Sequence, residues 1–131
     1  MKVQQLFALD ARSPGAARRF VRHTLGDRVA SGALDDIVLA TSELVTNAIL
    51  HARTELTLVV DVEEHDGTIR SVSLSVADGD PSPPVPQPFS PESVSGRGLL
   101  IIDALAERWG YGPRPDDEPG KQVWATLDLP A

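Results

Sequence analysis

Residues 34–52 read LDDIVLATSELVTNAILHA, and this stretch decides the fold of the 131-residue chain. Its apolar and small side chains recur every three to four positions, and it contains neither proline nor glycine. That spacing predicts a long helix packed on a core along one stripe. The stripe consists of Ile37, Thr41, Leu44, Val45, Ala48 and Ala52.

The segments around this helix predict an α+β fold. An earlier helix begins at Ser13-Pro14, because a serine can cap the free amides of the first turn and proline suits that turn. The apolar residues of this helix extend to Val29, and a break is expected at Ser31-Gly32. A later helix follows Gly96-Arg97-Gly98 and covers 99–106. Strand-like runs are expected at 3–9, 56–62, 68–76, 109–111 and 121–129, with an Asp66-Gly67 hairpin turn. This order predicts one domain, 1–131, built as a two-layer α/β sandwich with helices on one face of a mixed, mostly antiparallel sheet.

Composition excludes several classes of function. The chain has no cysteine, which removes disulfides, thiolate metal sites and cysteine nucleophiles. A net charge of −7 argues against direct nucleic-acid binding, because such affinity depends on neutralising phosphates. Neither a signal peptide nor a membrane-spanning run is present, so we expect a cytoplasmic protein without membrane contact.

Two polar residues of the long helix are candidates for a site. Glu43 and Asn47 are four positions apart and project from nearly the same face. An amide oxygen suits a hard cation such as Mg²⁺, and a carboxylate can accept a proton from an attacking hydroxyl. The pair alone is also compatible with a solvated polar stripe.

Two further motifs lie later in the chain. Asp78-Gly79 ends a predicted strand, where a carboxylate can accept from the exocyclic amine of a base. Gly96-Arg97-Gly98 opens a helix, whose free amides favour anions. Between them, 78–95 is rich in Pro, Ser, Gly and Asp, which is typical of a lid or binding loop. Each motif alone is equally compatible with a simple turn or connector.

Taken in order, residues 43–48, Asp78-Gly79 and 96–99 resemble the conserved boxes of the GHKL ATPase superfamily, which includes gyrase and histidine kinases. Residues 42–52, 98–109 and 120–124 look more specifically like the anti-sigma-factor serine/threonine kinases of actinobacterial type. The resemblance covers nearly the whole chain and implies a Bergerat-type ATP-binding fold with ATP and Mg²⁺ as cofactors.

The resemblance also implies roles for particular residues. Asn47 would coordinate Mg²⁺, Glu43 would act as or orient the catalytic base, and Asp78 with Gly79 would bind the adenine amino group. The lid glycines Gly96 and Gly98, with Arg97 and Leu99, would surround the phosphates.

This chain departs from the family pattern at three places. Asp78-Gly79-Asp80-Pro81 lacks the usual second glycine. Leu50 replaces a basic residue that His51 or Arg97 could substitute for. Lys121 stands where a threonine is common, and it either weakens a nucleobase contact or supplies a new cation.

The expected function is therefore that of an ATP-dependent regulatory protein kinase. It would bind a sigma factor and phosphorylate a serine or threonine on an anti-sigma-factor antagonist, with a homodimer left open. The alternative is an ATP-binding module with weak or absent catalysis, which regulates transcription by sequestering a partner protein. A detached relative of the histidine-kinase catalytic domain, acting on an external histidine, is a third reading.

Overall fold

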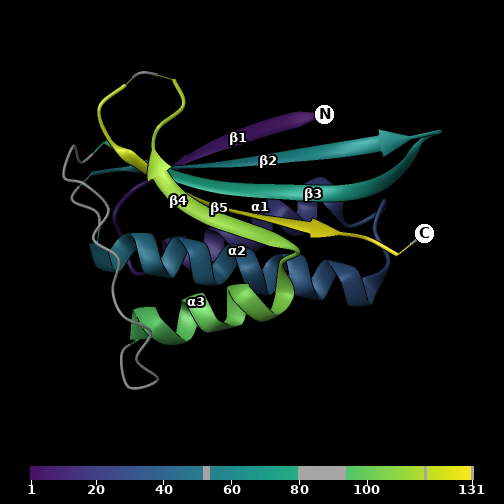
Figure 1. Ribbon diagram of the computed structural model, residues 1–131, viewed down its shortest axis with the longest axis horizontal. Coiled ribbons are helices and arrows are strands. Elements are labelled where there is room, and N and C mark those ends of the chain that lie inside the picture. The colour runs from purple at the N-terminus through teal and green to yellow at the C-terminus, as the bar shows by residue number, and fades with distance from the viewer. Residues whose placement is uncertain (52–53, 80–93, 117, 131) are drawn as a thin grey trace.

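The computed structural model describes residues 1–51, 54–79, 94–116 and 118–130, and it describes only the backbone of 51 and 94–99. The strands form one sheet in the order β1-β2-β3-β5-β4, with every neighbouring pair antiparallel. The helices lie on one face of that sheet (Figure 1). The expected α+β sandwich is thus confirmed. In chain order the elements are β1 (Lys2–Phe7), α1 (Ser13–Leu25), α2 (Ser31–His51), β2 (Leu56–His65), β3 (Thr68–Asp78), α3 (Val94–Leu105), β4 (Arg108–Pro113) and β5 (Lys121–Asp128).

The core lies between the sheet and α2. Alternate residues of the central strands are buried and stand opposite one another, because side chains along a strand alternate between its two faces. Leu58 is in register with Val76, and Val60 is in register with Leu74. Helix α2 covers these side chains and also packs on α1 and α3, which makes it the central helix of the layer (Figure 1).

The predicted end of α1 and the predicted start of α2 are wrong. Helix α2 begins at Ser31 and includes Gly32, because a glycine in the first turn disturbs few intrahelical hydrogen bonds. Helix α1 ends at Leu25, so Val29 lies beyond it, although Val29 still packs against the core.

Ser13 does not cap α1 as expected. It is the first helical residue, and its hydroxyl donates to the Ala8 carbonyl at 2.7 Å. The turn before the helix is held instead by Asp10, whose carboxylate accepts from the Arg12 amide at 2.7 Å. A side chain just outside the helix therefore fixes the approach of the chain.

The predicted hairpin between β2 and β3 is confirmed. Asp66 and Gly67 both have positive φ, at 54° and 77°. Two successive residues in this region are typical of the tight turn whose twist matches antiparallel strands, and Asp-Gly is a favoured pair for it.

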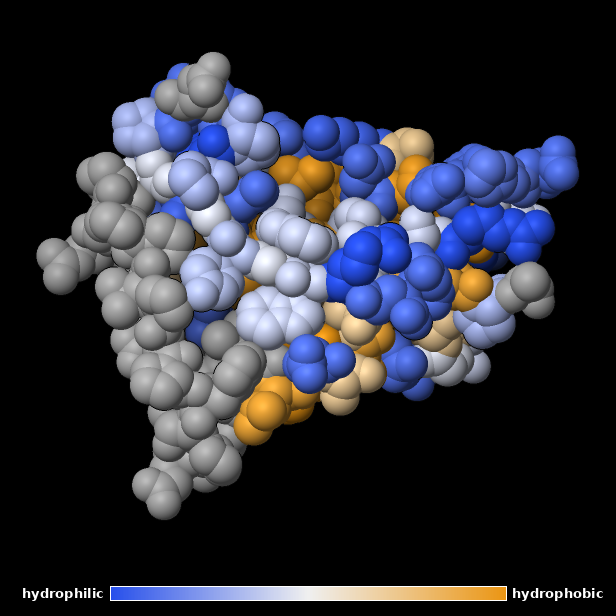
Figure 2. Space-filling view, viewed as in Figure 1, coloured by the Kyte–Doolittle hydropathy of each residue, from blue (hydrophilic) through white to orange (hydrophobic). Residues whose placement is uncertain are grey.

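The surface offers only separated apolar groups in the view of Figure 2, where most atoms are blue or white. Of the large apolar side chains that the structure describes, the exposed ones are spread over several elements: Met1, Leu6, Leu9, Leu39, Leu50, Leu100 and Tyr111. None of the helices within the described ranges is long and apolar enough to cross a lipid bilayer.

Candidate functional site

Glu43 and Asn47 lie in the second half of α2, one turn apart, and both are half-buried. The helix stripe beside them is fully buried, since Leu44 and Val45 are each 1% exposed. This packing holds the backbone of the two polar residues rigidly on the helix that covers the sheet.

The side-chain oxygen of Asn47 is buried and has no hydrogen-bond partner among the described residues. An unsatisfied buried carbonyl oxygen costs about 1–3 kcal/mol, and such groups are rare enough to need an explanation. A cation bound at that oxygen would remove the cost, because amide oxygens are suitable ligands for Mg²⁺. The donor chemistry at Asn47 therefore fits the expected metal.

Asp78 is a buried carboxylate on the helix-facing side of the sheet. The strand was expected to end at Val76, but β3 continues to Asp78, which is 5% exposed and in register with Leu56. The alternation that buries Leu74 and Val76 therefore places a charged group where an apolar one would continue the core.

Lys121 compensates this charge. It is the first residue of β5 and the register partner of Asp78, and its Nζ lies 3.3 Å from Asp78 Oδ1. The two side chains are 13% and 6% exposed. Burying a single carboxylate is costly, whereas a paired one can be tolerated.

A hydrogen bond fixes the chain after Asp78. The Gly79 amide donates to Thr54 Oγ1 at 2.7 Å, which ties the end of β3 to the connection between α2 and β2. Thr54 was not predicted from the sequence. The signal lay in the hairpin register, because Leu56 opposite Asp78 places residue 55 opposite Gly79 and Thr54 directly next to that position.

Arg114 is a second cation near this carboxylate that the sequence analysis missed. Its pKa is raised, mainly by the hydrogen bond to Asp116, with a smaller contribution from the attraction of Asp78. The same contact lowers the pKa of Asp116. The backbone after β4 turns here, since the Arg114 amide approaches the Gly120 carbonyl at 3.4 Å. Lys121 therefore pairs with Asp78, and Arg114 is near enough to attract it electrostatically.

The Gly96-Arg97-Gly98 motif lies within α3 rather than before it. The helix begins at Val94, so residues 94–97 carry the amides that have no partner within the helix. The side chains of His51, Arg97 and Leu99 lie outside the described residues, as does 80–93, which forms most of the expected lid.

The predicted residues approach one end of the sheet. Asp78, Gly79 and Lys121 are joined by the contacts above, at the end where α2 finishes and α3 begins (left in Figure 1). Glu43 and Asn47 lie on α2, which packs on β3 and α3. Within the described ranges, no group of three or more acidic or histidine side chains could hold a metal alone.

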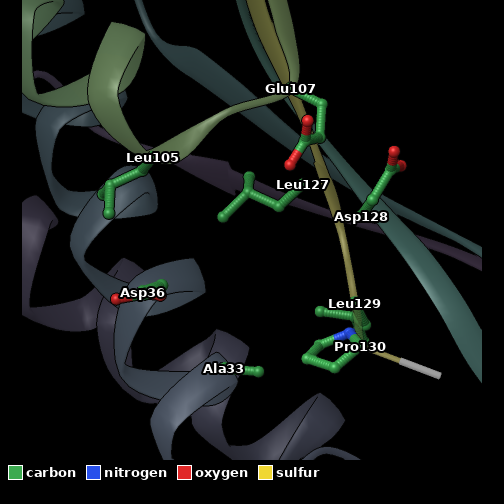
Figure 3. A pocket seen from close by; sticks show the side chains of 8 residues that line it. All are labelled: Ala33, Asp36, Leu105, Glu107, Leu127, Asp128, Leu129 and Pro130. Carbon is green, nitrogen blue, oxygen red and sulfur yellow. The ribbon is translucent and has the colours of Figure 1, made fainter.

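A cleft of about 260 Å³ lies away from this end, between the start of α2, the end of α3 and the end of β5. Leu105 and Leu127 line it, and the carboxylates of Glu107 and Asp128 lie near its edge (Figure 3). Asp36 also lines this cleft, and it lies roughly 16 Å from Asn47 along the axis of α2. The acidic rim of the cleft would repel phosphates, so the cleft is a poorer candidate for a nucleotide site than the end of the sheet near Asp78.

Two solved structures share this fold. The RsbU and RsbW domains of Rv1364c from Mycobacterium tuberculosis match with a TM-score of 0.71 and 21% identity, covering 100% of this chain and 34% of that chain. This chain thus spans about a third of that protein. The Acinetobacter baumannii histidine kinase AdeS matches with a TM-score of 0.51 and 16% identity, covering 98% of this chain and 68% of that chain.

No curated protein sequence matches the chain significantly. The family model of the histidine kinase-like ATPase domain, however, matches residues 7–127. Because that match spans nearly the full length, the chain belongs to the histidine kinase-like ATPase domain family.

Proposed function

We propose that this chain binds Mg·ATP at the end of the sheet where Asn47 and Asp78 lie, and that it acts as a regulatory serine/threonine protein kinase. The observation that carries the proposal is the buried oxygen of Asn47, which has no hydrogen-bond partner in the described part of the chain. It has the chemistry of a Mg²⁺ ligand and lies on the helix whose motif resembles that of ATP-binding relatives.

The carboxylate of Asp78 would receive the adenine amino group. A buried carboxylate accepts hydrogen bonds only, and the exocyclic amine of adenine donates them. Thr54 holds the Gly79 amide and so fixes the backbone beside this carboxylate. The free amides at the start of α3 would face the phosphates, where the positive end of the helix favours anions.

Mg·ATP would supply the phosphoryl group: the substrate hydroxyl oxygen bonds to the terminal phosphorus as the bond to the departing ADP oxygen breaks. Glu43, one turn before Asn47 on the same helix face, would accept the hydroxyl proton. The protein otherwise contributes positioning and charge stabilisation, as in phosphoryl transfer generally. The phosphates would be surrounded by the residues predicted for that part of the site: His51, Gly96, Arg97, Gly98 and Leu99.

The proposed protein partners are a sigma factor, which the chain binds, and an anti-sigma-factor antagonist, which it phosphorylates. This part rests on the sequence resemblance and on the shared fold with a structure that contains an RsbW domain. The test uses γ-labelled ATP, Mg²⁺ and the purified antagonist from the source cell. We expect label on a serine or threonine of the antagonist, and its loss in Glu43→Ala.

A nucleotide-binding module without transfer chemistry is the second candidate, favoured by Asp80-Pro81 in place of the usual glycine pattern. Binding of Mg·ATP with no label on the antagonist would support this candidate and reject the kinase. Retention of full transfer in Glu43→Ala would instead reject Glu43 as the base.

A further inference from the structure

The ion pair of Asp78 and Lys121 presents an acceptor beside a donor on the helix-facing side of the sheet. The two residues are register partners on β3 and β5, and the Nζ–Oδ1 distance is 3.3 Å. Both side chains are largely buried, at 6% and 13% exposed, so neither charged group is simply a solvated surface group. The pair is therefore built into the structure at the position proposed for the base.

The backbone fixes where the lysine begins. Gly120 has φ of +135°, and it packs directly on the Asp78 carbonyl. Lys121 follows at once and points to the same face as Val123 and Ala125, because it is two and four residues before them on one strand. The lysine is thus directed along the core face and not into bulk solvent.

An adenine edge has the complementary pattern. Its amino group donates, and the ring nitrogen beside that group accepts. A carboxylate can only accept, and an ammonium group can only donate. A guanine in the same placement would present an oxygen to the carboxylate and an N–H to the ammonium, and both contacts would be repulsive.

We propose that Lys121 is a nucleobase-specificity residue: its ammonium donates to the ring nitrogen beside the adenine amino group while Asp78 accepts from that amino group. This inference rests on the proposed function, because it needs the base to lie at Asp78. It adds a direct, charged contact from Lys121, the residue that neutralises Asp78.

The test compares ATP with 1-deaza-ATP, in which the ring nitrogen is replaced by C–H, by calorimetry in the presence of Mg²⁺. A hydrogen bond to a charged group contributes about 1.5–3 kcal/mol, which corresponds to roughly 10- to 100-fold in affinity. We expect the wild-type chain to prefer ATP by that factor. Equal affinities in the wild-type chain would overturn the inference without any variant.

Variants identify the residue responsible. Lys121→Met should bind ATP and 1-deaza-ATP equally, whereas Lys121→Gln, which keeps a donor, should retain part of the preference. The matched control is Lys2→Met, since Lys2 is the only other lysine and is exposed on β1. It should leave the preference unchanged.

The remaining outcomes separate the two proposals. No binding of ATP by the wild-type chain would reject the proposed function itself. An undiminished preference in a folded Lys121→Met would show that another group contacts the ring nitrogen, which overturns the inference. Equal weakening of ATP, 1-deaza-ATP and GTP in that variant would assign Lys121 to the phosphates or to packing, and would also overturn it.

Discussion

Gly120 packs against the carbonyl oxygen of Asp78 so closely that a Cβ at position 120 would overlap that oxygen. The φ of Gly120 is +135°, a conformation that residues with side chains rarely adopt. The glycine therefore serves two purposes at once. It lets the chain turn into β5, and it brings Lys121 beside the Asp78 carboxylate.

Gly120→Ala should lower the free energy of unfolding by about 1–3 kcal/mol, because it combines an unfavourable φ with a backbone clash. It should also weaken Mg·ATP binding, since Asp78 would have to shift. Chemical denaturation and calorimetry measure the two effects. The control is Gly112→Ala on neighbouring β4, where no atom lies within 4 Å of the added methyl group. Equal stability of these two variants would refute the close packing at Gly120.

Thr54→Val should destabilise the fold by about 1–2 kcal/mol, because it leaves the Gly79 amide without its 2.7 Å acceptor. It should also reduce the affinity for Mg·ATP, since Gly79 adjoins the proposed base contact. Thr54→Ser keeps the hydroxyl and should restore both properties. If Val and Ser variants bind Mg·ATP alike, Thr54 has no positioning role.

Asp10 should titrate with a pKa of about 2, lowered from 3.8 mainly by its side-chain hydrogen bond with Arg12 and then by the Arg12 amide. Because the pKa in the folded state is depressed, the stabilisation is present above about pH 4 and is lost as the pH falls toward 2. NMR titration of the Asp10 carboxyl carbon measures this pKa. Arg12→Ala should move the pKa up toward 3.8, and an unchanged value would contradict the assignment.

The sequence predicted the layers of the fold because the decisive patterns are local. The stripe from Ile37 to Ala48 has helical spacing, and the structure buries it. The residue types of Asp66 and Gly67 alone predict the turn between β2 and β3. The start of α2 was missed because Ser31-Gly32 has the composition of a break, although the first turn of a helix tolerates it.

The arrangement around Asp78 could not be predicted in the same way. The carboxylate interrupts an apolar alternation, so the pattern seemed to end at Val76. What allows the strand to continue is Lys121, which is 43 positions away in sequence and adjacent only in the folded sheet. The Thr54 contact is likewise set by strand register and not by any local motif.

The unpartnered oxygen of Asn47 could not be inferred from the sequence either. The helical spacing placed Asn47 beside Glu43, but only the packing shows that the Asn47 oxygen is buried and that no described residue is its partner. This feature leads to a specific expectation for Asn47→Ala. The substitution should weaken Mg·ATP binding without lowering the stability of the fold.

The central claim is tested most directly by calorimetry of Mg·ATP binding to Asn47→Ala, with Leu39→Ala at an exposed position of the same helix as the control. Without nucleotide, Asn47→Ala should be as stable as the wild-type chain or more stable by about 0.5 kcal/mol, because alanine favours helices and the unsatisfied oxygen is gone. Its affinity for Mg·ATP should fall at least about tenfold, in line with the loss of a ligand to the metal, while Leu39→Ala binds normally. A folded Asn47→Ala that binds Mg·ATP with wild-type affinity would contradict the proposed site.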